Sequence, residues 1–135
     1  MTATPTPTPE APSGTVIGSG SFDSSTGVGL NTHTAWTAAE QADGSVKLTL
    51  SVYVRSYTLE IGQRSIAISV NGATSGGMTR SFSVDSPNSQ TDTLIYTYST
   101  TVQKGSAVSV SVDWNYKGQY SGRDLDVISS SSSIF

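Results

Sequence analysis

Residues 45–57 read Ser-Val-Lys-Leu-Thr-Leu-Ser-Val-Tyr-Val-Arg-Ser-Tyr and hold the most regular pattern in the chain. Apolar side chains occupy every second position, and polar or amphipathic side chains stand between them. The apolar set is Val46, Leu48, Leu50, Val52 and Val54. Because successive side chains of a strand point to opposite faces, this alternation predicts a strand with one buried and one solvated face.

Such a strand needs a second sheet to cover its apolar face. Residues 108–116 repeat the pattern, with Val108, Val110, Val112, Trp114 and Tyr116 alternating with polar residues. Other short alternating segments are separated by turn residues, of which Asn71-Gly72 is the strongest hairpin signal. The sequence therefore predicts an all-β fold, an antiparallel β-sandwich of about eight or nine short strands.

Several boundaries follow from the same patterns. We expect one strand over residues 78–84, in which Arg80 interrupts the apolar set and indicates a position near a sheet edge. A strand over residues 91–99 places Leu94, Tyr96 and Tyr98 on one face. Residues 117–120 are expected to form a turn, and the last strand to run within residues 125–134. The serine run at 129–133 fits either a strand edge or a loose tail.

Residues 1–13 differ in composition from the rest and hold four of the five prolines. Repeated X-Pro pairs favour an extended arm of polyproline II type. We therefore divide the chain into an arm or linker, residues 1–13, and a sandwich domain, residues 14–135. If the arm docks on a partner rather than acting as a linker, its prolines are the contact candidates: Pro5, Pro7, Pro9 and Pro12.

Charge and composition narrow the function classes. The net charge is −3 and no basic run is present, which argues against nucleic-acid binding. No apolar stretch is long enough to span a membrane. The absence of cysteine excludes disulfides and thiolate metal sites. The first residues lack the basic and apolar segments of a secretion signal.

The sequence offers no persuasive catalytic set, so we expect a protein that is not an enzyme and has no cofactor or metal. His33 is the only histidine, and serine and aspartate are too plentiful to indicate a triad around it. Asp113 with Asp124 or Asp126 is a weak carboxylate pair for glycoside hydrolysis. A calcium site from Asp85, Asn88 and Asp92 is equally weak, because no EF-hand spacing is present.

The tyrosines suggest contact surfaces instead. An exposed tyrosine can stack on a sugar or anchor a protein contact, although cross-strand pairing within a sheet is the plainer interpretation. The candidates for glycan contact are Tyr53, Tyr57 and Tyr120. The candidates for contact with a partner protein are Arg55, Tyr57 and Arg80.

Three segments resemble the Ig-like modules of siphophage minor structural proteins. They are residues 36–40, the run Leu-Ser-Val-Tyr-Val-Arg-Ser-Tyr at 50–57, and above all Val-Asp-Trp-Asn-Tyr-Lys-Gly-Gln-Tyr-Ser-Gly at 112–122. In that family, two aromatic residues at a strand end and a following X-Gly-X-Tyr-Ser-Gly close the module. Residues 19–22 also resemble the opening of the module. The resemblance covers roughly residues 18–134, and departs from the family at the charged residues 123–126.

The resemblance implies an Ig-like sandwich that serves as a virion component, displayed on a phage head or tail and assembled in the host cytoplasm. Its partners would be capsid or tail proteins, reached through the arm or through one edge or end of the sandwich. The family supplies no catalytic residues. A module that binds host-surface carbohydrate, and so serves adhesion, is the alternative. The oligomeric state stays open, from monomers to homotrimers.

Overall fold

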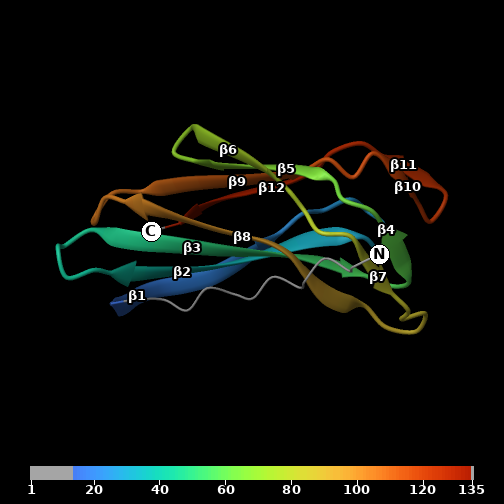
Figure 1. The fold of residues 1–135 in the computed structure, drawn as a ribbon, viewed down its shortest axis with the longest axis horizontal. Helices are drawn as coiled ribbons and strands as arrows, with labels where there is room; N and C mark the ends of the chain where they lie inside the picture. Colours follow the sequence, from blue (N-terminus) through green and yellow to red (C-terminus); the bar gives the residue numbers. More distant parts are fainter. Residues whose placement is uncertain (1–13, 135) are drawn as a thin grey trace.

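The computed structural model describes residues 14–134, which form two four-stranded antiparallel sheets packed face to face (Figure 1). The first sheet has the strand order β1-β2-β3-β8, and the second has the order β12-β9-β5-β6. Two pairs of short strands, β4 with β7 and β10 with β11, lie at one end. The predicted all-β sandwich is confirmed.

The first sheet consists of β1 (Thr15–Asp23), β2 (Asn31–Glu40), β3 (Val46–Ser56) and β8 (Thr91–Val102). The second consists of β5 (Ser65–Val70), β6 (Ala73–Met78), β9 (Val108–Trp114) and β12 (Ile128–Ile134). The short strands are β4 (Leu59–Ile61), β7 (Phe82–Val84), β10 (Gly118–Tyr120) and β11 (Arg123–Leu125).

The core lies between β3 of the first sheet and β9 and β5 of the second. All five alternating apolar residues of β3 are at most 1% exposed, as are Val108, Val110 and Val112. The apolar residues of the alternating patterns thus point inward from both sheets. Burying a side chain of this size contributes about 1.5–3 kcal/mol relative to leaving it exposed, so this face accounts for much of the stability.

The chain changes sheets three times, twice at the end that carries β4 and β7 and once, between β8 and β9, at the opposite end. It leaves β3, passes through β4 and enters β5 of the opposite sheet. Later it returns from β7 to β8, which pairs with β3, and crosses again to β9, which pairs with β5. Strands β3 and β5 therefore each pair with a strand that comes much later in the chain, and the register of these two pairs depends on contacts between residues distant in sequence.

The segment that carries the family resemblance is a compact unit at the end of β9. Trp114 is fully buried, and its ring centroid lies 5.3 Å from that of Tyr116. The Tyr116 hydroxyl donates to the Gln119 carbonyl at 2.7 Å. Burial raises the pKa of Tyr116. Ser121 and Gly122 both have positive φ, which is the conformation of a type I′ hairpin turn between β10 and β11.

Two predicted boundaries are wrong. Residues 117–120 are not simply a turn, because β10 begins at Gly118 and the turn falls at residues 121–122. The predicted strand over 78–84 is divided: β6 ends at Met78 and β7 begins at Phe82. Between them the buried Thr79 still donates its amide to the Arg64 carbonyl of the second sheet at 2.8 Å, whereas the next residue, Arg80, bonds to the Leu94 carbonyl of the first sheet.

The prediction that Leu94, Tyr96 and Tyr98 share one face of the strand is also wrong. The pairing of β8 with β3 shifts between Val52 and Tyr53, and Ile95 is the extra residue. A β-bulge of this kind resets the alternation. Ile95 is therefore 1% exposed, while Tyr96 and Tyr98 remain on the core side, half-buried. The serine run at 129–133 is a strand, since it pairs with β9 along its whole length.

Candidate functional site

A hollow of about 530 Å³ lies at the end of the sandwich that carries the short strands. Three segments distant in the sequence line it: the loop before β2, the segment that leads from β3 into β4, and the β10–β11 hairpin. The lining residues are Gly29, Tyr57, Thr58, Leu59, Glu60, Gln119, Tyr120 and Ser121. Its size is that of sites that bind small molecules, about 300–1,000 Å³.

Two tyrosines, Tyr57 and Tyr120, form one wall of this hollow, which we call the tyrosine groove. The Tyr57 amide donates to the Tyr120 hydroxyl at 3.2 Å, so the hairpin is tied to the end of β3. The Tyr57 ring lies over Gly29, where an added Cβ would come within 3.0 Å of the ring carbons Cδ2 and Cε2. A side chain at this position would therefore crowd the Tyr57 ring. Tyr57 remains 40% exposed, so the ring is available for contact.

The loop behind Tyr57 is held by its own hydrogen bonds. The Thr26 hydroxyl donates to the Leu30 carbonyl at 2.7 Å, and the Asn31 side chain accepts from the Thr26 amide at 2.9 Å. Arg123 of the hairpin donates to the Thr26 carbonyl at 2.7 Å. Loop and hairpin therefore brace each other, and the groove is formed before any ligand arrives.

Polar side chains complete the groove. Glu60 stands between two buried residues of β4 and is exposed. Neither its carboxylate nor the side-chain amide of Gln119 has a partner among the residues that the structure describes. Glu60 is the one charged residue among those that line the groove. The groove therefore offers a ligand an aromatic surface, several hydrogen-bond acceptors and the side-chain amide of Gln119, and Glu60 gives it a negative charge.

Tyr53, the third predicted glycan candidate, lies elsewhere. It is on the outer face of the first sheet, where its ring centroid is 6.1 Å from that of His33 on β2. The structure thus brings Tyr57 and Tyr120 together and separates Tyr53 from them. For Tyr53, the structure therefore shows packing between neighbouring strands, the plainer of the two interpretations of the tyrosines.

The same outer face carries a row of charged side chains that crosses all four strands. Asp23 contacts His33 at 2.5 Å, and Arg55 donates to both Asp92 oxygens, at 2.8 and 3.1 Å. Arg55 also lies 3.7 Å from Asp23. The hydrogen bonds from Arg55 hold the pKa of Asp92 below its usual value. We call this set the outer charge row. It joins edge strand β1 to edge strand β8 through the two central strands.

Arg80, a predicted partner contact, has a structural role. Its Nε donates to the Leu94 carbonyl at 3.0 Å, next to the bulge of β8, and its Nη1 donates to the Ser81 carbonyl at 3.1 Å. The guanidinium also lies 5.8 Å from the centre of the Phe82 ring. These contacts hold the chain between β6 and β7 and leave the side chain only partly exposed.

The other candidates do not assemble into a reactive set. Asp124 and Asp126 line a shallow hollow beside Lys117, whereas Asp113 lies on β9 outside it. Asp92 is engaged by Arg55. Among residues 14–134 no three His, Asp or Glu side chains gather as metal ligands would. The prolines of the arm lie outside the described residues.

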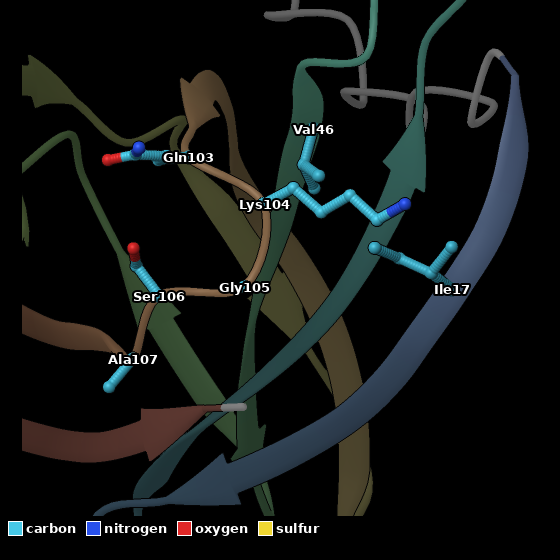
Figure 2. A pocket seen from close by; sticks show the side chains of 7 residues that line it. All are labelled: Ile17, Val46, Gln103, Lys104, Gly105, Ser106 and Ala107. Carbon is cyan, nitrogen blue, oxygen red and sulfur yellow. The ribbon is translucent and has the colours of Figure 1, made fainter.

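A second hollow, of about 160 Å³, lies at the opposite end of the sandwich (Figure 2). It is lined by Ile17, Val46 and the β8–β9 turn, residues 103–107. The Lys104 side chain extends across it toward Ile17 and forms an ion pair with Glu40. This hollow is smaller than the tyrosine groove, and the Lys104 side chain that lines it is engaged in the ion pair.

The tyrosine groove could not be found from sequence, because its residues come from three separate segments. The signals were limited to the exposed tyrosines and the glycine-rich loop before β2. No family model, curated protein or solved structure matches this chain. The described part of the chain contains no helix that could cross a membrane.

Proposed function

We propose that this chain is a non-enzymatic accessory module of a phage particle, a sandwich displayed on the head or tail. The proposal rests on the likeness to the Ig-like modules of siphophage minor structural proteins. The main supporting observation is that the residues of this likeness hold structural positions in the fold. Trp114 and Tyr116 pack against the core, and Ser121 and Gly122 make the tight turn that lets Tyr120 reach the Tyr57 amide.

The resemblance therefore involves residues that determine the structure rather than shared composition alone. A residue with a Cβ is disfavoured at the positive φ of Gly122, and a smaller side chain at position 114 would leave a cavity. These are requirements of the module's architecture. They support a common design with the phage modules and indicate nothing about a reaction.

The place where β1 begins suggests how the module is attached. β1 begins beside Glu40, at the end of the sandwich that holds the smaller hollow. The tyrosine groove lies at the other end, about 30 Å away for a strand of this length. A module held by its arm would project the groove away from the particle. An extended arm can bind along a partner's surface, and many copies on one lattice add avidity.

The experiment is co-sedimentation with phage particles that lack this protein. We compare the full chain with a chain that begins at Gly14, which keeps every residue of the sandwich. We expect the full chain to pellet in a fixed ratio to the particle protein and the shortened chain to stay in the supernatant. Binding of neither chain to head or tail would contradict the proposal.

A matched variant separates the arm from the sandwich surface. Arg55→Ala removes the half-exposed guanidinium of the outer charge row and leaves the arm unchanged. If the arm is the anchor, this variant pellets as the full chain does. If Arg55→Ala abolishes pelleting while the shortened chain still binds, the outer face of the first sheet is the docking surface, and the arm is a linker.

A further inference from the structure

We propose that the tyrosine groove is a binding site for a neutral sugar of a glycan chain. The proposal concerns the end of the sandwich opposite the start of β1, so it does not depend on particle docking. It begins from the shape of the site, a preformed hollow of about 530 Å³ with one exposed aromatic wall. The Tyr57 ring lies directly over Gly29, in the loop that is bonded to the hairpin through Arg123.

The chemistry of the lining selects a sugar. A pyranose ring has an apolar face of C–H groups and a rim of hydroxyls, which are donors and acceptors at once. Tyr57 offers an exposed ring for the apolar face. The Glu60 carboxylate can accept from two neighbouring hydroxyls, and the Gln119 amide can both donate and accept. Neither group is engaged elsewhere in the described chain, so neither must give up a partner.

The charge of the site disfavours acidic ligands. Glu60 is the one charged residue that lines the groove, and it forms no ion pair within residues 14–134. A uronic acid or phosphate bound there would lie close to this carboxylate, and the repulsion between like charges costs binding free energy. The structure therefore points to neutral hexoses or N-acetylhexosamines and away from charged sugars.

The geometry also argues for a saccharide rather than a strand. No residue of β3 or β8 lines the groove, and the wall residues come from loops, a three-residue strand and a hairpin. An added β-strand needs a row of free backbone groups along a sheet edge. The polar side chains of the groove lie around a compact hollow instead, which suits one or two sugar rings.

The test is a titration of the ¹⁵N-labelled full chain, followed by amide chemical shifts. The probes are maltotriose, cellotriose and tri-N-acetylchitotriose, with trigalacturonate as the acidic comparison. We expect one or more neutral trisaccharides to shift the amides of Gly29, Glu60, Gln119 and Ser121 at millimolar concentration. Trigalacturonate should bind at least tenfold more weakly.

Two variants and a control locate the binding. Tyr57→Ala should weaken binding about tenfold, since an aromatic contact of about 1–1.5 kcal/mol corresponds to that ratio. Glu60→Gln keeps the shape of the side chain and removes its charge. It should weaken the binding of the neutral trisaccharides and reduce the difference in affinity between them and trigalacturonate. Tyr53→Ala, on the outer face of the first sheet, should bind as the unchanged chain does.

Two outcomes would overturn the proposal. In the first, none of the neutral trisaccharides shifts the groove amides at about 10 mM. In the second, Tyr53→Ala weakens binding as much as Tyr57→Ala does. If the first outcome holds and a peptide of residues 2–13 does shift the groove amides, the groove is a site for a proline-rich peptide. Because the titration uses the isolated chain, failure here leaves the co-sedimentation result unaffected.

Discussion

Gly76 and Gly77 are neighbours on β6, yet the structure gives their replacement by alanine opposite effects. A Cβ on Gly76 has Ile66 O as its nearest neighbour, at 4.0 Å. A Cβ on Gly77 would come within 2.7 Å of Cζ and 2.8 Å of Cε1 of the Tyr96 ring, distances that real side chains essentially never show. Gly77 therefore lets the edge strand of the second sheet lie directly over Tyr96 of the first.

The magnitudes follow from these contacts. Gly76→Ala restricts the unfolded chain without a clash and should raise the free energy of unfolding by about 0.4–1 kcal/mol. Gly77→Ala forces either β6 or the half-buried Tyr96 ring to move, and overpacking of this kind costs about 1–3 kcal/mol. The two variants should therefore differ by about 1.4–4 kcal/mol, although both add one methyl group to the same strand.

Urea unfolding, monitored by circular dichroism, measures the difference. With an m value of about 2 kcal/mol/M, the midpoints of the two variants should lie about 0.7–2 M apart. In a Tyr96→Val background the penalty of Gly77→Ala should disappear, because the ring carbons that it meets are gone. Equal midpoints for Gly76→Ala and Gly77→Ala would show that β6 does not cross Tyr96, and would refute the reasoning.

Three further predictions concern the core, a turn and the outer charge row. Trp114→Ala should lower the free energy of unfolding by about 3–5 kcal/mol in thermal unfolding, because the ring is fully buried. Asn71→Gly keeps the positive φ but loses the bond from the Ser109 amide to the Asn71 side chain, 2.9 Å, and should cost about 1 kcal/mol in the same assay. The pKa of Asp92 is lowered by Arg55, so the contribution of Asp92 is present above pH 3.8 and is lost as the pH falls through the depressed value. The stability advantage of the unchanged chain over Asp92→Asn should vanish in urea titrations between pH 5 and about pH 2, and an advantage that persists at the acid end would contradict this.

The regular part of the fold was predictable because its signal is local. The face of each β3 residue follows from its place in the alternation, and the positive φ values of Asn71 and Gly72 follow from two residue types that tolerate this conformation. The glycine at position 44 likewise marks the β2–β3 turn, where its φ is 87°. These features depend on a few neighbouring residues, so no knowledge of the opposite sheet is needed to place them.

The errors occurred where a distant contact overrides the local pattern. Ile95 breaks the alternation of β8, because a bulge adds one residue against β3. Residues 78–84 alternate as a strand would, yet Thr79 and Arg80 bond to Arg64 and Leu94, and the chain turns away from the second sheet. Nothing within either segment specifies its partner, so periodicity alone could not find the break.

The same argument explains where a binding site should lie in this chain. The long strands are fixed by alternation, and their outer faces carry mostly short hydroxyl side chains and the paired charges of the outer charge row. The four three-residue strands, which the sequence patterns did not separate, gather at one end and line or adjoin the tyrosine groove. At that end Gly29 accepts the Tyr57 ring and Glu60 stays unpaired within the described chain, although neither choice serves the regular sandwich. Residues that a fold does not require for its own packing are where selection for binding can act, which is why we place the search for a ligand at the groove.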